Sequence, residues 1–329
     1  MARSSSLAPS LVPPRSVADW LVPLVLIAAA ATLPFFASNY YMQFASKVLL
    51  MGTAAMALNL CVGFGGMVSM CHAAFFGLAG YVLALSSPDY EAASLWTSLP
   101  LAMLVSAFAA LVFGALALRT KGIYFIMVTL AFGEMLFFLF HDTKIGGGSD
   151  GAFIYVKPEA MIGAYRLFDL ENKTTYFLFS LAIVAACWWV LSRLTTSHFG
   201  HALMAARDNE RRARSLGFDV FRIRLTAFAI SGAIAGLAGY LSAAQFGFVA
   251  PQLLGWHSSA TLLVMVVLGG MSSVAGPLVG ALVLMGLEEV LKANTDHWKL
   301  IEGTIIILIV LFMPGGVRQI FALVGARHD

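Results

Sequence analysis

The chain has 329 residues, of which 60% are hydrophobic and only 11% are charged. Because soluble domains carry about 25% charged residues, this composition excludes a water-soluble globule and a disordered chain. The net charge of +3 is too small to suggest binding to nucleic acid. Cys61, Cys71 and Cys187 lie in apolar runs without metal-ligand spacing, so neither disulfides nor zinc are expected. The composition is that of a polytopic membrane protein.

The apolar segments predict an all-α protein with about ten (8–10) transmembrane helices, because a span needs about 20 apolar residues. Some of these segments are short or interrupted. Residues 1–18 could begin a signal peptide, but the long run that follows and the further spans favour a retained cytoplasmic tail. The expected spans are 19–37, 44–62, 67–86, 97–118, 122–140, 176–193, 225–248, 258–273, 277–292 and 300–317. We expect one membrane domain, with a first half at 19–193 and a second at 225–329.

The distribution of lysine and arginine predicts the orientation, since short loops rich in these residues stay in the cytoplasm. The loop 194–224 is the most basic part of the chain. If it lies inside, an N-terminus and a C-terminus in the cytoplasm follow for ten spans, and the loop 141–175 faces the periplasm. That outer loop contains a glycine-rich run, 146–151. It is either a solvated, flexible connector or a docking face for an external partner.

The basic loop also predicts a short amphipathic helix lying flat beneath the membrane. Asp208 is a candidate N-cap, and Gly217 suits the left-handed position that ends a helix. Arg207, Arg211 and Arg214 would then share one face. The alternative is a basic loop held near anionic membrane lipid.

Small residues recur at a spacing of four, which favours close helix packing in lipid. The pairs are Ala73 and Gly77, Gly232 and Gly236, Ala235 and Gly239, and Gly276 and Gly280. A second pattern is Gly-Gly-Met at 65–67 and again at 269–271, each between apolar segments. Glycine clusters in matching positions indicate interrupted helices, the pattern of transporter binding sites.

Ionisable residues at membrane depth are costly and suggest function. We expect Glu134 to face inward, where it either lines a path or bonds to a neighbouring helix, and His72 to be a satisfied buried histidine more often than a ligand. The sequence has no arginine ladder, potassium filter, HExxH, GxSxG or Walker motif. The chain is therefore not expected to be an enzyme, and another chain must bind ATP if ATP drives transport.

Several blocks in order resemble the M-type permease subunit of branched-chain amino acid (Liv-type) ABC transporters. The resemblance covers nearly the whole chain from about residue 40. The blocks are 63–69, 72–77, 119–125, 128–134, 199–217, 269–270 and 313–316.

The resemblance implies an importer of the bacterial inner membrane for branched-chain or other hydrophobic amino acids. It implies a second, homologous permease subunit, a periplasmic binding protein and two cytoplasmic ATPases, which bind ATP and Mg; no cofactor is expected in this chain. The loop 197–217 would dock on an ATPase, with Glu210, Ala213 and Gly217 matching the motif and Arg212 departing from it.

The candidate residues fall into two sets. The ATPase-coupling set is Asp208, Glu210, Arg211, Arg212, Ala213 and Gly217. The translocation-pathway set is Gly65, Gly66, His72, Tyr124, Thr129, Glu134, Gly269 and Gly270. Alternative functions are a permease of the same class for urea, short amides or aromatic and organic acids, and a secondary transporter driven by ions through Glu134. The interrupted glycine segments disfavour a purely structural scaffold.

Overall fold

The structure is a computed structural model that describes residues 18–312, except 37, 88–91, 163–164 and 167–168. The predictions for the two tails and for the block 313–316 lie outside the described residues. The first part of the chain forms α1 (Ala18–Phe36), α2 (Asn39–Asn59), the π-helix η1 (Leu60–Phe64), α3 (His72–Ser86), α4 (Leu95–Ala117) and α5 (Ile123–Asp142). After α5 come the 3₁₀-helix η2 (Ile145–Asp150), β1 (Ala152–Phe153), β2 (Met161–Ile162) and β3 (Tyr165–Arg166).

The rest of the chain returns to helices. It forms α6 (Lys173–Thr196), α7 (His198–Asp208), α8 (Glu210–Ser215), α9 (Val220–Phe246), β4 (Phe248–Val249), the 3₁₀-helix η3 (Pro251–Leu253), α10 (Trp256–Gly269), α11 (Gly276–Asn294) and α12 (Trp298–Phe312). The predicted all-α class is therefore confirmed. The strands form only two short antiparallel pairs within the described residues, β1 with β4 and β2 with β3.

The predicted count of about ten spans is not confirmed. Within the described residues, six helical stretches are long and apolar enough to cross a membrane. They are Asn39–Phe64, Leu95–Ala117, Ile123–Asp142, Lys173–Thr196, Val220–Phe246 and Pro251–Gly269. The helices α3 and α12 have 15 residues each. At about 1.5 Å per residue, such a helix is shorter than a hydrocarbon layer of about 30 Å.

The expected span 67–86 is wrong at its start. After η1 the backbone leaves helical geometry at Gly66, whose φ is +65°, and α3 begins only at His72. Glycine adopts this left-handed conformation without the steric cost that other residues incur. The segment 65–71 is thus a non-helical link between two helices, as the glycine pattern predicted. The matching pattern at 269–271 links α10 to α11, and Gly270 has a φ of +97°.

The helix α9 lies at the centre of the bundle and packs against α2, α3 and α4, while α11 packs against α2 and α10. Helices of the two expected halves therefore pack against one another.

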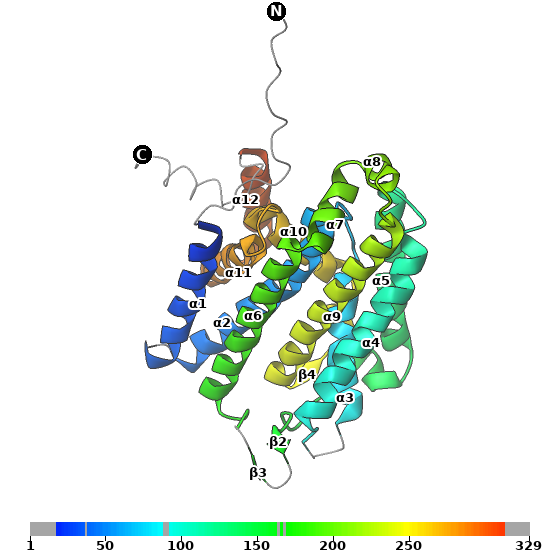
Figure 1. Ribbon diagram of the computed structural model, residues 1–329. Coiled ribbons are helices and arrows are strands. Elements are labelled where there is room, and N and C mark those ends of the chain that lie inside the picture. The colour runs from blue at the N-terminus through cyan, green and yellow to red at the C-terminus, as the bar shows by residue number, and fades with distance from the viewer. Residues whose placement is uncertain (1–17, 37, 88–91, 163–164, 167–168, 313–329) are drawn as a thin grey trace, which may run out of the picture.

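Figure 1 shows α7 and α8 at one end of the bundle and β2 and β3 at the other. The basic loop and the loop 141–175 lie at opposite ends, as the sequence predicts. The second of these loops is tied to the bundle, because β1 pairs with β4 and the Ile154 N–H donates to the Gly247 carbonyl at 2.8 Å.

The expected close packing of small residues is confirmed along α9. A Cβ on Gly232 would lie 2.4 Å from the Cβ of Ala110 on α4, and one on Gly239 would lie 1.9 Å from the Phe76 carbonyl oxygen on α3. Neither distance leaves room for a methyl group. The backbones of α9, α3 and α4 are close enough for dispersion contacts to hold them together in lipid.

We expect Gly239→Ala to lower the free energy of unfolding by about 1–3 kcal/mol, because the new methyl group must displace the α3 backbone. The control is Gly286→Ala on α11, where an added Cβ meets nothing within 4 Å. Thermal aggregation midpoints of the detergent-solubilised variants, followed by fluorescence-detected size-exclusion chromatography, measure the difference. Equal midpoints for the two variants would contradict this packing.

Candidate coupling and translocation site

The basic loop folds into two helices instead of the predicted one. Ser197 caps α7, accepting from the Gly200 N–H at 3.3 Å. At Asn209 the backbone is extended, with φ −154° and ψ 96°, and the Asn209 side chain accepts from the Arg212 N–H at 3.0 Å to cap α8. Asp208 is therefore not the cap that the sequence suggested; it ends α7 and pairs with Arg207 at 2.8 Å.

The break at Asn209 also changes the expected arginine face. Arg207 lies on α7, whereas Arg211 and Arg214 lie on α8, so the three do not share one face of one helix. The prediction failed because Asn209 combines a backbone conformation and a side-chain acceptor that end one helix and begin the next. Arg211 and Arg212 are exposed on α8.

Gly217 ends α8 in the left-handed conformation that the sequence predicted, with a φ of +87°. Its N–H donates to the Arg214 carbonyl at 3.0 Å, and the Phe218 N–H donates to the Ala213 carbonyl at 3.2 Å. This pair of bonds is the Schellman motif, which satisfies carbonyls left free at a helix C-terminus. The Ala213 side chain is buried with Ala206 and Val220, so a small apolar cluster fastens α8 to α7 and α9.

Glu210 connects α8 to two other parts of the bundle. Its carboxylate accepts from Lys121 at 3.0 Å, from Arg214 at 2.7 Å and from Arg224 of α9 at 3.1 Å. Partial burial raises the pKa of Glu210, but the hydrogen bond from Lys121 and the positive charges of Arg224 and Lys121 outweigh it and lower the pKa below its ordinary value. Arg224 also donates to the Ala206 carbonyl at 3.1 Å. Glu210 therefore holds the α7–α8 segment against the α4–α5 link and α9.

Arg207 joins the same segment to the helix break. Its Nη1 donates to the Gly63 carbonyl in η1 at 2.6 Å, and its Nε donates to Asp208 at 2.8 Å. A Cβ on Gly66 would lie 2.6 Å from the Arg207 Cγ, so the arginine stem lies directly over this glycine. A π-helix frees backbone carbonyls from the regular α ladder, and such segments are frequent at functional sites.

The two glycine links meet at this point. The Asn59 side chain donates to the Ser273 carbonyl at 2.8 Å, and a Cβ on Gly63 would lie 2.2 Å from the Met271 carbonyl oxygen. The segments 65–71 and 269–273 are therefore adjacent, and Arg207 reaches the same place. We call this group of residues the junction; it consists of Asn59, Gly63, Gly66, Arg207, Met271 and Ser273.

His72 is a satisfied buried histidine in this structure. Its Nδ1 is 3.0 Å from the Ser69 Oγ and its Nε2 is 2.7 Å from the Ser231 Oγ, which in turn donates to the Ala57 carbonyl at 2.5 Å. Thr129 of α5 is also buried, and its Oγ1 accepts from the Met70 N–H at 3.1 Å. Both side chains hold the link 65–71 in place, and their role in a pathway remains a prediction.

Glu134 takes the second of its two expected positions, because it bonds to a neighbouring helix. Its Oε1 accepts from the Trp256 N–H at 2.8 Å, at the N-terminus of α10, where the helix dipole favours a negative charge. Tyr124, in contrast, lies in the first turn of α5 and is 68% exposed. The structure therefore brings Gly65, Gly66, His72 and Thr129 together, with Gly269 and Gly270 beside the junction, and places Tyr124 apart.

Four residues in this region escaped the sequence prediction as site residues: Lys121, Arg207, Arg224 and Asn59. The three cations belong to the positive charge that set the predicted orientation, but charge counting does not reveal which carboxylate or carbonyl each one binds. Asn59 is a polar residue within an apolar run, and this feature of the sequence could have identified it as a site residue.

Comparisons with known proteins place the chain in a family. Residues 40–310 match the family model described as the branched-chain amino acid transport system / permease component. The chain is 33% identical to the high-affinity branched-chain amino acid transport system permease protein LivM of Salmonella typhimurium, covering 89% of this chain and 73% of that protein. Identity to LivM of Escherichia coli K12 is 32%, with 91% and 74% covered, and identity to LivH of Salmonella typhimurium is 26%, with 57% and 61% covered. No solved structure matches the chain.

We expect Glu210→Gln to loosen the α7–α8 segment, because Arg224 is only 20% exposed and would lose its carboxylate partner. Trypsin should then cut the variant near Arg211 and Arg212 several-fold faster than it cuts the unaltered protein. The control is Asp219→Asn, which removes an exposed pair with Arg222 and keeps a side chain able to cap α9. Equal cutting rates in the two variants would show that Glu210 does not hold the segment.

Proposed function

Because this chain belongs to the family of branched-chain amino acid transport system permease components, we propose that it is one permease subunit of an ATP-driven importer. The substrate class is branched-chain or other hydrophobic amino acids. The relatives are named as transport permeases, and permeases are not enzymes. The distinct LivM and LivH relatives support a pathway formed with a second, unlike permease subunit.

The end of the bundle that carries α7 and α8 faces the cytoplasm in this proposal, in the bacterial inner membrane. Two ATPase subunits bind ATP and Mg there, and a periplasmic binding protein delivers the amino acid at the opposite end. The basic character of 194–224 supports this orientation. The exposed Arg211 and Arg212 of α8 are the surface offered to an ATPase, since the ion pairs of Glu210 use Arg214 and Arg224 instead.

Family membership carries the proposal, and the observation that supports coupling to an ATPase is the hydrogen bond from Arg207 to the Gly63 carbonyl. It connects the segment expected to contact an ATPase with the junction of the two helix breaks. ATP shifts a permease between conformations only through its different affinity for them. A force on α7 reaches the backbone at Gly63 through one side chain, without passing through a flexible loop.

An ion-driven transporter working through Glu134 is less well supported. The Glu134 carboxyl group accepts a hydrogen bond from the N-terminus of α10, which is a structural role. Family membership also favours the ATP-driven mechanism.

We expect Gly217→Pro to leave membrane insertion intact and to abolish the stimulation of ATP hydrolysis by transport. Proline requires a φ near −65° and has no N–H to donate to Arg214, so α8 loses its C-terminal motif. Gly217→Asn is the matched variant, because asparagine tolerates the left-handed conformation and an added Cβ meets nothing within 4 Å. The two variants are compared by measuring leucine uptake and ATPase activity of the reconstituted transporter. Normal uptake by the proline variant would contradict the coupling role.

We expect Arg207→Met to uncouple transport from hydrolysis. Methionine keeps an apolar stem over Gly66 but cannot donate to the Gly63 carbonyl, so the ratio of leucine transported to ATP hydrolysed should fall several-fold. Arg222→Met on α9 is the control, because Arg222 is exposed and pairs only with Asp219 among the described residues. An unchanged ratio in Arg207→Met would remove the mechanical link from the proposal.

A further inference from the structure

A cavity of about 290 Å³ opens at the end of the bundle opposite to α7 and α8. This volume is at the lower limit of ligand pockets, which measure roughly 300–1,000 Å³, and it suits a molecule of amino-acid size. Its walls come from the first turns of α2 and α6, the last turn of α9 and the loop before α6. The lining residues are Met42, Gln43, Ser46, Lys157, Glu171, Lys173, Tyr176 and Gln245.

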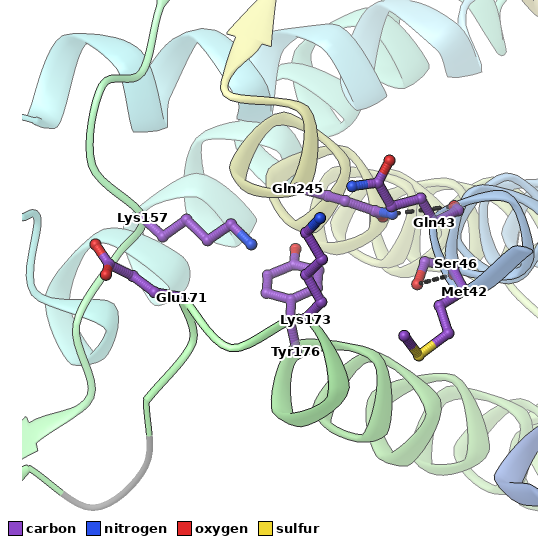
Figure 2. Close-up of a pocket in the computed structure, with 8 residues that line it drawn as sticks. All are labelled: Met42, Gln43, Ser46, Lys157, Glu171, Lys173, Tyr176 and Gln245. Atoms are coloured by element: carbon purple, nitrogen blue, oxygen red, sulfur yellow. Dashed lines mark hydrogen bonds between the residues drawn. The ribbon is translucent and has the colours of Figure 1, made fainter. Parts of the chain in front are cut away.

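Two cations are directed into this cavity. Figure 2 shows the amines of Lys157 and Lys173 reaching the space beside the Tyr176 ring, while the Glu171 carboxylate points away from them. The Lys157 Nζ lies 4.5 Å from the centre of that ring. Among the described residues, neither lysine has a carboxylate within ion-pair distance. Burial lowers the pKa of Lys157, and Lys173 adds to this shift, while the attraction of Glu171 and Asp169 opposes it. The two amines therefore offer a place for an anion.

Gln245, which lines the same cavity, carries one unpaired acceptor, and the cavity also has an apolar wall. The Gln245 amide donates through Nε2 to the Gln43 carbonyl at 3.1 Å, and its Oε1 is buried without a hydrogen-bond partner in the described structure. A buried acceptor left unpaired costs roughly 1–3 kcal/mol, so a donor in the cavity would be favourable. The Met42 side chain and the Tyr176 ring are buried and form the apolar surface.

We propose that this cavity is an entry site for the free amino acid, with the α-carboxylate held by Lys157 and Lys173 and the α-ammonium by Gln245 Oε1. The aliphatic side chain lies against Met42 and the Tyr176 ring. This inference takes its substrate class from the proposed function. It adds to that function a binding site at the end of this subunit opposite to α7 and α8. An anion alone would satisfy the lysines, but only a zwitterion satisfies the lysines and the glutamine together.

The three native cysteines are buried, so a single cysteine placed at the cavity reports on its occupancy. We propose Gln43→Cys in the complete transporter with its ATPases and second permease, in detergent and without the binding protein. The rate of alkylation by a maleimide is measured during a leucine titration. Leucine should slow the reaction in proportion to occupancy, to about one tenth at ten times its Kd. Lys144→Cys, on an exposed loop at the same end, should react at a constant rate.

Three further arms test the chemistry. Leucine amide, which has no carboxylate, should not protect, and 4-methyl-2-oxopentanoate, which has no ammonium, should need a higher concentration than leucine. Adding Lys157→Gln and Lys173→Gln to Gln43→Cys should abolish protection, with intact assembly confirmed by co-purification of the ATPases. No protection by leucine, protection unchanged in the lysine variants, or equal potency of the oxo acid would overturn the proposal. Protection by ligand-free binding protein but not by leucine would overturn it as well, because the cavity would then accept a protein side chain.

Leucine uptake by the unaltered transporter separates this inference from the proposed function. Uptake that requires ATP and the binding protein, together with no leucine protection at Gln43→Cys, would refute the entry site alone. Absence of uptake would refute the proposed function independently of the cavity.

Discussion

A helix that is interrupted within lipid leaves backbone groups that water cannot reach, and the protein must satisfy each of them. In the link 65–71 and the turns beside it, local backbone carbonyls satisfy the Gly66 and Met67 N–H groups, and side chains from other helices satisfy several of the remaining groups. The Gly63 carbonyl is bound by Arg207 of α7, the Met70 N–H by Thr129 of α5, and the Ala73 N–H by Ser259 of α10 at 3.2 Å. His72, at the start of α3, is bonded to Ser231 of α9. The conformation of this link therefore depends on the positions of α5, α7, α9 and α10 at the same time.

Some charged side chains at the two ends of the bundle form ion pairs and others do not, and the two kinds have different roles. At one end Glu210 is paired with Lys121, Arg214 and Arg224, whereas Arg211 and Arg212 of α8 remain exposed. At the other end Lys157 and Lys173 line a cavity in which, among the described residues, no carboxylate lies within ion-pair distance of them and the Glu171 carboxylate points away, as Figure 2 shows. Charged side chains that form ion pairs hold a segment in place, whereas charged side chains without such a partner are available to a ligand or to another protein.

The helical class, the opposite placement of the two long loops and the left-handed Gly217 follow from local rules, and sequence reasoning recovered all of them. Apolar length, loop charge and glycine conformation are properties of short segments. The number of spans stays unconfirmed, with α3 and α12 apolar but only 15 residues long. Where the apolar run becomes helical at His72 depends on the link before it. The cap at Asn209 was missed because Asp208 has the same preference, and only the extended backbone at Asn209 decides between them.

Pairings between distant segments were beyond the reach of sequence reasoning for a different reason. Arg207 and Gly63 are 144 residues apart, and Asn59 and Ser273 are 214 apart. A single sequence reports charge and polarity at each position but not which partner the packing of α9 brings close. The glycine clusters at 65–66 and 269–270 were visible as breaks, yet their contact with one another and with Arg207 arises only when α2, α7 and the α10–α11 link assemble.

Energetics limit what the junction can do by itself. A hydrogen bond to a charged group contributes about 1.5–3 kcal/mol, whereas moving a two-state equilibrium from one extreme to the other takes about 5.5 kcal/mol. The Arg207 bond alone is therefore too weak to drive a complete change of access. The three ion pairs of Glu210 and the buried Ala213, Ala206 and Val220 make α7 and α8 move as one body with the start of α9. Two parallel routes connect the α7–α8 end of the bundle with the helix breaks, one through Arg207 and one through α9, whose Ser231 contacts His72 and the Ala57 carbonyl.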